Sequence, residues 1–171
     1  MKFDIPLFDL SYANVQLKDD ILKIVERHIE TSSFILGPDV QLFEDKFAGL
    51  VGSKYAIGVN SGTDALIIGL KALGIKSGNE VITVPNSYIA TAQAIALVGA
   101  TPVFVDVYES TFNIDCEKLE LAIQNTISEQ KLTPKAIIPV DLFGVPARYR
   151  LIEDIAKKYD LKVIEDAAQS F

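Results

Sequence analysis

The sequence has few of the residues that build disulfides, metal sites and nucleophilic centres. Its 171 residues include one cysteine, Cys116, and one histidine, His28. A single cysteine cannot form a disulfide within the chain, which favours a reducing compartment. Cys116 follows Asp115 at an expected helix start, a position that can lower a thiol pKa, but its neighbours do not suggest nucleophilic catalysis. His28 lies between charged residues of an expected helix, which indicates a solvated side chain. The sequence shows no cluster with metal-ligand spacing, so it predicts no metal site.

Long apolar runs and an excess of positive charge are also missing. No run reaches the length needed to span a bilayer, and residues 1–20 carry acids and a proline where a signal peptide has an unbroken apolar core. The formal net charge of −7 argues against a nucleic-acid surface, although an acidic protein can still bind an anion locally. We therefore expect a cytoplasmic protein without a membrane or nucleic-acid partner.

Helix and strand patterns alternate along the chain. The 3.6-residue apolar period predicts helices over residues 18–31, 40–51, 63–73, 88–98, 116–127 and 147–159, with Asp39 favouring the start of the second. Near-continuous, β-branched apolar runs predict strands buried on both faces at residues 55–59, 80–84, 101–107, 136–142 and 161–166. This alternation predicts an α/β fold with a mainly parallel sheet and flanking helices.

Polar or glycine-bearing segments follow four of the predicted strands. They are "NSGTD" at 60–64, "PNSY" at 85–88, "DLFG" at 141–144 and "EDAAQS" at 165–170. In a parallel sheet the carboxyl ends of the strands share one edge, where ligands collect. The sequence therefore predicts a site at that edge.

The first of these segments has two interpretations. Gly62 permits a close backbone approach, and we expect the N–H groups of Thr63, Asp64 and Ala65 to be free at a helix N-terminus, which binds phosphate. A plain helix cap by Ser61 or Thr63 explains the same residues. The spacing matches neither a P-loop nor G-x-G-x-x-G and does not decide between the two.

Glu165, Asp166 and Tyr88 also allow two interpretations each. A carboxylate at the end of a buried strand is costly unless it meets a cation or donors. Asp166 or Glu165 could face a cationic partner such as a protonated ring nitrogen, or make a salt bridge or a helix cap. Tyr88 could stack on a planar ligand or pack as an ordinary aromatic.

Six segments, in order, resemble the amino-terminal half of the sugar-nucleotide aminotransferases of the DegT/DnrJ/StrS family. They are "FILGPDVQLFEDKFA", "AIGVNSGTDALIIGLKALGI", "GNEVITVPNSYIATAQAI", "GATPVFVDV" with "NID", "KAIIPVDLFG" and "LKVIEDAAQS". The resemblance implies the aspartate-aminotransferase fold (PLP fold type I) and the cofactor pyridoxal 5′-phosphate (PLP). It implies an N-terminal helical segment over residues 1–35 and a large domain over 36–171 that is incomplete at its C-terminus.

The resemblance also implies the PLP-binding residues, which are Gly62, Thr63, Asp64, Tyr88, Asp166 and Gln169. The first three lie at the helix N-terminus that takes the phosphate. Tyr88 matches the aromatic that stacks on the pyridine ring, Asp166 matches the acid that pairs with the ring nitrogen, and Gln169 matches the residue that hydrogen-bonds the ring hydroxyl.

By the same resemblance, glutamate gives its amino group to PLP, and the amine passes to a keto group on a nucleotide-linked hexose. The product is an amino sugar for a surface polysaccharide, a glycoprotein or an antibiotic. "SGTDAL" slightly favours a 3-keto over a 4-keto sugar. Family enzymes are dimers, which implies a homodimer for the complete protein.

The chain departs from the family in two places. Asp141, Leu142, Phe143 and Gly144 stand where members often have His-Leu-Tyr-Gly. The family's Schiff-base lysine lies in a Ser-Phe-x-x-x-Lys segment beyond Phe171, so we expect the 171 residues alone not to transaminate. Strands that follow residue 171 in the family lie between the first and fifth strands, which predicts a gap in the sheet.

Two alternatives stay open at this point. One is a PLP-dependent sugar dehydratase of the same family, in which a histidine replaces the lysine. The other is a truncated, non-catalytic relative with a binding or regulatory role.

Overall fold

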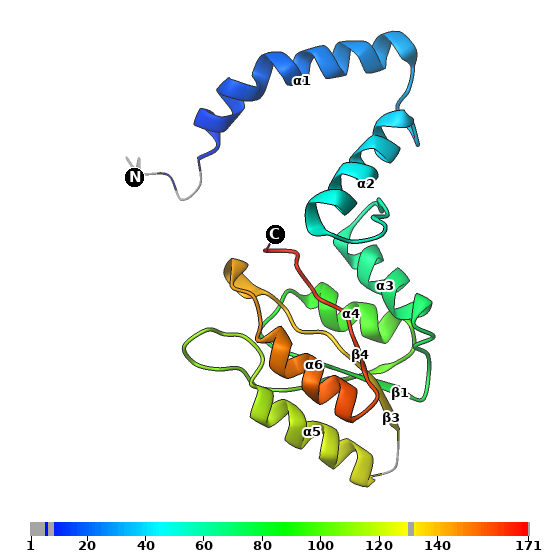
Figure 1. Cartoon of the computed structure of the whole chain (residues 1–171), viewed down its shortest axis with the longest axis vertical. Helices are drawn as coiled ribbons and strands as arrows, with labels where there is room; N and C mark the ends of the chain where they lie inside the picture. Colours follow the sequence, from blue (N-terminus) through cyan, green and yellow to red (C-terminus); the bar gives the residue numbers. More distant parts are fainter. Residues whose placement is uncertain (1–5, 7–8, 130–131, 171) are drawn as a thin grey trace. The chain divides into compact units, whose positions relative to one another are not determined.

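The computed structural model describes residue 6, residues 9–129 and residues 132–170. The chain forms two compact units, residues 1–58 and residues 59–171 (Figure 1). The division predicted after residue 35 stays a prediction. Phe171, beyond which the family's lysine is expected, lies outside the described residues.

The first unit contains two helices, α1 (Ser11–Thr31) and α2 (Pro38–Val51). Helix α1 begins earlier than its apolar pattern predicts, and the Asp9 carboxylate accepts the Ser11 N–H there at 2.8 Å. As predicted, Asp39 lies in the first turn of α2. Its carboxylate contacts Arg27 and also His28 Nε2, the latter at 3.1 Å. His28 is therefore only partly solvated, with 25% of its side chain exposed.

The second unit is built on a parallel sheet, as predicted. Its four strands run in the order β2 (Thr101–Phe104), β1 (Asn79–Thr83), β3 (Thr133–Ile137) and β4 (Lys162–Val163). All three pairings are parallel. Because the chain leaves β1 for β2 on one side and then places β3 on the other, the topology reverses between β1 and β3.

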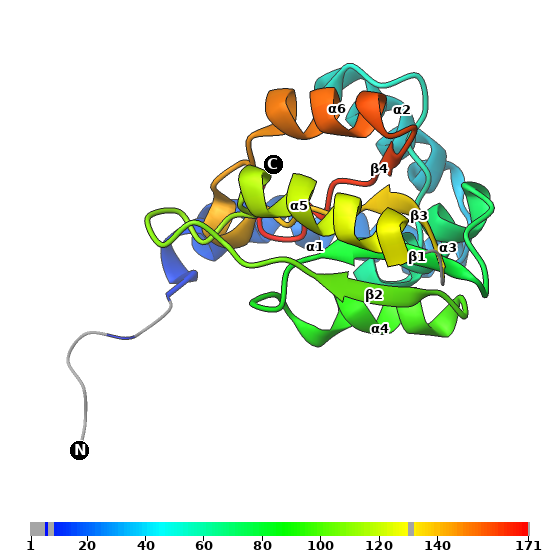
Figure 2. The same cartoon turned by 90° about the horizontal axis from the view of Figure 1, so that it is seen from below.

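Helices cover both faces of this sheet. Helices α3 (Gly62–Ala72) and α4 (Ile89–Leu97) pack on one face, and α5 (Cys116–Glu129) and α6 (Tyr149–Lys158) pack on the other. Figure 2 shows the sheet between α4 and α5. Each of these helices corresponds to a predicted one within a few residues. The short 3-10 helix η1 (Leu142–Gly144) follows β3.

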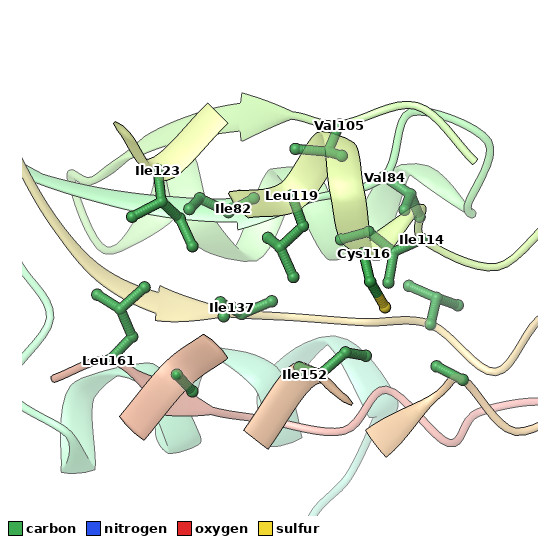
Figure 3. Close-up of a cluster of buried hydrophobic side chains, with 13 residues drawn as sticks. Ile82, Val84, Val105, Ile114, Cys116, Leu119, Ile123, Ile137, Ile152 and Leu161 are labelled. Carbon is green, nitrogen blue, oxygen red and sulfur yellow. The ribbon is translucent and has the colours of Figure 1, made fainter. Parts of the chain in front are cut away.

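The strands have apolar residues on both faces, which is why their sequences are nearly continuous apolar runs. Val81 of β1 belongs to the cluster packed against α3 and α4. The next residue, Ile82, belongs with Ile137 of β3 to the cluster on the opposite face. There they meet Leu119 of α5 and Ile152 of α6 (Figure 3). The sheet is thereby fixed between two layers of helices.

Cys116 belongs to this second cluster and is 5% exposed. Burial raises the pKa of its thiol. The helix start therefore does not lower this pKa, and the thiol is a core side chain.

The strand predicted at residues 55–59 does not form. A strand is stable only when a neighbouring strand satisfies its backbone groups, and no segment of the described residues pairs with this one. At the other end of the chain, β4 pairs with β3 alone among the described residues and so lies at the edge of the sheet. The gap predicted between the first and fifth strands stays a prediction.

Three predicted strands also differ in extent, and the strand predicted at 161–166 is observed only at Lys162–Val163. The predicted strand 101–107 ends at Phe104, and Val107 instead forms an isolated antiparallel bridge with Ile114. The strand predicted at 136–142 is observed at Thr133–Ile137. No helix among the described residues combines the length and apolarity needed to cross a membrane.

We predict that Ile137→Ala lowers the free energy of unfolding by about 2–5 kcal/mol, because it leaves a cavity between β3 and both helices of its face. Ile137 is fully buried. Leu121→Ala on α5, where the side chain is 56% exposed, is the control and costs less than about 0.5 kcal/mol. Urea unfolding measures both, and equal losses contradict the assigned core.

Candidate functional site

A cavity of about 390 Å³ lies at the carboxyl end of the sheet. This volume is within the usual range for small-molecule sites. It opens where the topology reverses between β1 and β3, the place where α/β sheets bind ligands. Four separate segments line it, contributing Gly62, Thr63, Leu66, Ser87, Tyr88, Ala90, Thr91, Val140, Leu142, Asp166, Ala168 and Gln169.

The N-terminus of α3 forms one wall of the cavity. Ser61 is the N-cap, and its Oγ accepts the Asp64 N–H at 3.1 Å. The Ala65 N–H donates to the Ser61 carbonyl at 3.0 Å. The prediction that Asp64 and Ala65 keep free N–H groups is therefore wrong. The N–H groups of Gly62 and Thr63 have no partner among the described residues.

Asp64 differs from its two neighbours because it does not line the cavity. The Ser61 hydroxyl donates to the Asp64 carboxylate at 2.8 Å, and the Asp64 N–H donates to the oxygen of that hydroxyl. Ser61 and Asp64 thus form a reciprocal cap. Both interpretations of this segment hold together, since the capped helix also presents two unpaired N–H groups to the cavity.

Asp166 also lines the cavity and is largely buried, at 8% exposure. Its Oδ2 accepts the Thr91 hydroxyl at 2.7 Å, and its Oδ1 accepts the Ala168 N–H at 3.3 Å. No ion pair joins Asp166 to a basic side chain in the described part of the chain. The salt-bridge alternative is therefore not observed, and the charge is held by donors.

Gln169 is oriented by the loop that follows β3. The Phe143 N–H donates to Gln169 Oε1 at 2.8 Å. Phe143 has a positive φ of 59°, a conformation that is uncommon outside glycine. Because the amide oxygen is occupied, Gln169 presents its NH₂ group as a donor.

Tyr88 is the N-cap residue of α4 and is 78% exposed. An aromatic that packs in a core would be buried, so this ring is available to a ligand. The structure therefore brings five of the six expected residues, all except Asp64, around one cavity. It also adds Thr91, whose only sequence signal is its position one helical turn after Tyr88.

A sequence profile of the DegT/DnrJ/EryC1/StrS aminotransferase family matches residues 15–171. The chain belongs to this family. Among curated relatives, the UDP-2-acetamido-2-deoxy-3-oxo-D-glucuronate aminotransferase of Pseudomonas aeruginosa is 46% identical over 98% of this chain and 45% of its own length. A pleiotropic regulatory protein of Geobacillus stearothermophilus is 42% identical over 98% of this chain and 43% of its own length.

A third relative is the UDP-N-acetyl-3-dehydro-alpha-D-glucosamine 3-aminotransferase of Acidithiobacillus ferrooxidans. It is 44% identical over 97% of this chain and 43% of its own length. The chain thus spans less than half the length of the curated relatives named here.

Solved structures agree with this assignment. A DegT/DnrJ/EryC1/StrS aminotransferase from Brucella abortus matches with a TM-score of 0.95 and 42% identity, over 97% of this chain and 44% of the other. NtdA from Bacillus subtilis, solved with the cofactor PMP bound, matches with a TM-score of 0.84 and 39% identity, over 91% of this chain and 34% of the other. Aminotransferases of this family use PLP.

The cavity fits that cofactor. Two unpaired N–H groups at a helix N-terminus suit a phosphate, an exposed aromatic suits a planar ring, and a buried carboxylate suits a protonated ring nitrogen. The described residues contain no cluster of three His, Cys, Asp or Glu side chains able to hold a metal ion.

Asp141, which replaces the family's frequent histidine, is a buried structural residue. It is 1% exposed, and its carboxylate accepts the Ala147 N–H at 2.9 Å, the Tyr149 hydroxyl at 2.8 Å and the Ser170 hydroxyl at 3.0 Å. Its own N–H donates to the Asp166 carbonyl at 3.1 Å. Asp141 thereby ties the loop after β3 to the segment that carries Asp166 and Gln169.

Two pKa shifts follow from this arrangement. Burial and the Asp141 carboxylate raise the pKa of Tyr149, which stays protonated and donates. Loss of solvation and the neighbouring Asp141 raise the pKa of Glu165. Glu165 loses only part of its solvation and does not line the cavity, whereas its neighbour Asp166 is buried there, so of the two only Asp166 is placed to meet a ligand.

We predict that Gly144→Ala destabilises the protein more than Gly74→Ala. Both glycines have positive φ values, 80° and 73°, so each alanine costs about 1–2 kcal/mol. Only at Gly144 would the new Cβ also lie 3.2 Å from a backbone atom, the Gln169 oxygen. Urea unfolding measures the free energy of unfolding of both variants. Equal losses would contradict the prediction, because they would show that the Gln169 segment moves away from the new Cβ at little cost.

We also predict that Glu165→Gln raises the melting temperature at pH 7.5 more than at pH 4.5. Because the folded-state pKa is raised, the stability that Glu165 contributes is present at low pH and is lost as pH rises through that pKa. Glutamine stays neutral and avoids the loss. The control is Asp154→Asn on the exposed face of α6. A shift of equal size at both pH values contradicts the prediction.

Proposed function

We propose that this chain is the PLP-binding portion of an aminotransferase that moves an amino group from glutamate to a keto sugar nucleotide. The observation that carries the proposal is the Asp166 carboxylate, which is buried at the cavity and held by donors without a cation. A ring nitrogen that carries a proton supplies the missing positive partner.

PLP, when bound, acts as an electron sink, and an anion beside its ring nitrogen keeps that nitrogen protonated. The N–H groups of Gly62 and Thr63, together with the dipole of α3, bind the phosphate. Asp64 contributes indirectly, because its pairing with Ser61 holds the first turn of α3 in place.

The remaining residues orient the ring. The exposed ring of Tyr88 would pack against it, and the Asp166 carboxylate would accept from the protonated ring nitrogen. The amide NH₂ of Gln169 would donate to the ring hydroxyl, since the Phe143 N–H occupies the amide oxygen. None of the described lysines lines the cavity. We therefore propose that amino transfer needs a lysine from outside residues 1–171, and that these residues alone do not transaminate.

For the acceptor we infer a 3-keto sugar in preference to a 4-keto sugar. The names of two relatives, a 3-oxo-glucuronate aminotransferase and a 3-dehydro-glucosamine 3-aminotransferase, support this choice. The product is an amino sugar for polysaccharide biosynthesis. We further propose that the complete protein works in the cytoplasm and, as the resemblance to the family implies, as a homodimer.

We predict that Asp166→Asn weakens the binding of pyridoxamine 5′-phosphate by roughly 10–100-fold, since a hydrogen bond between charged groups contributes about 1.5–3 kcal/mol. This ligand carries an amine and so binds without a covalent link to a lysine. The control is Asp106→Asn, whose exposed carboxylate pairs with Lys118 away from the cavity. An absorbance titration of the complete protein that contains this chain measures both.

The same protein is then assayed for 2-oxoglutarate release from glutamate in the presence of a UDP-linked 3-keto sugar. Failure of the unmodified protein to bind the cofactor rejects the proposal. Binding without amino transfer favours the dehydratase or regulatory alternatives.

A further inference from the structure

Two hydroxyl groups connect the cavity wall to Asp166. Thr91, in the first turn of α4, is 2% exposed, and its Oγ1 donates to Asp166 Oδ2 at 2.7 Å. Ser87 precedes α4, and its Oγ lies 2.9 Å from Thr91 Oγ1. All three residues line the cavity. They form a continuous row of polar atoms that ends at the carboxylate.

The direction of these hydrogen bonds follows from counting protons. A threonine hydroxyl carries one hydrogen, and Thr91 gives it to Asp166. Thr91 can therefore only accept from Ser87, so the Ser87 hydroxyl is the donor of the second bond. Both bonds point toward the negative charge, and such a chain polarises and strengthens in a low-dielectric site.

The contact is not the usual one for a threonine in a helix. A helical threonine hydroxyl commonly bonds the carbonyl four residues earlier. Here the hydroxyl instead reaches a carboxylate 75 positions later in the sequence. The bond therefore contributes to the position of Asp166 and is not needed to satisfy the helix.

We propose that Thr91 is a positioning residue for the cofactor, which fixes the Asp166 carboxylate for the ring nitrogen, and that Ser87 supports it by donating to the Thr91 hydroxyl. The inference rests on the proposed function. It also gives α4 two tasks, because the same helix carries Tyr88 at its N-cap and the Thr91 N–H donates to the Tyr88 carbonyl at 3.2 Å. One element thus sets the contacts with both the ring face and the ring nitrogen.

The test uses pyridoxamine 5′-phosphate and the complete protein that contains this chain. We expect Thr91→Val, which keeps the shape and removes the hydroxyl, to weaken binding by roughly tenfold or more. It should also reduce the induced circular dichroism of the bound ligand, which reports a fixed orientation. Thr91→Ser restores the hydroxyl and most of both signals. Ser87→Ala, outside the helix and only partly buried, causes a smaller loss in the same direction.

Thr83 offers a matched control for the loss of a buried hydroxyl. It is fully buried on β1, its Oγ1 donates to the Ile138 carbonyl at 2.8 Å, and it does not line the cavity. Thr83→Val removes a comparable hydrogen bond without touching Asp166. We expect it to lower the melting temperature but to leave ligand affinity and circular dichroism unchanged.

The outcomes separate this inference from the proposed function. If the unmodified protein does not bind the ligand, the proposed function fails and this inference with it. If it binds, the inference alone is overturned by a Thr91→Val protein that binds normally, by a Thr91→Ser protein as weak as Thr91→Val, or by an equal loss in Thr83→Val. Should Thr91→Val fail to fold, an unchanged affinity in Ser87→Ala overturns the inference.

Discussion

The buried carboxylate of Asp166 is the constraint on which the site depends. A charge at the end of a covered strand is costly unless donors meet it, and here the donors come from α4 and from the turn after Asp166 itself. The backbone is fixed as well, because the Asp166 N–H donates to the Pro139 carbonyl at 3.0 Å. The position of the Asp166 carboxylate at the cavity therefore depends both on the packing of α4 and on the segment after β3.

This coupling explains why a site can form from segments that lie far apart in the sequence. A parallel sheet brings the carboxyl ends of its strands to one edge, and the reversal between β1 and β3 leaves a gap there that helices do not fill. The segments containing Tyr88, Leu142 and Asp166 each reach this edge from a different strand. The N-terminus of α3 adds Gly62, Thr63 and Leu66 to the lining of the same cavity.

Local patterns predicted the helices and the parallel sheet, since the 3.6-residue period follows from helix geometry and continuous apolar runs from burial on both faces of a sheet, although α1 has no buried residue. They failed where the outcome depends on a distant partner. Residues 55–59 have a strand-like sequence but pair with no segment in the part of the chain that the structure describes. Cys116 lies at a helix start, yet burial decides its pKa. The N–H groups of Asp64 and Ala65, which were expected to be free, instead donate to Ser61. The residue spacing could not predict this, because it fits a helix cap and a phosphate site equally well.

Two aspartates at the same edge show how a structural role and a ligand-binding role can be told apart. A carboxylate has about four acceptor positions. Asp141 uses three of them for donors at 2.8–3.0 Å and does not line the cavity. Asp166 receives one short bond from Thr91 and one long bond from Ala168, and it lines the cavity. Asp141 has almost no acceptor position left for a ligand, and it joins the loop after β3 to the segment that carries Asp166. Asp166 keeps free lone pairs beside the cavity, and an additional donor from a ligand would complete its hydrogen bonding.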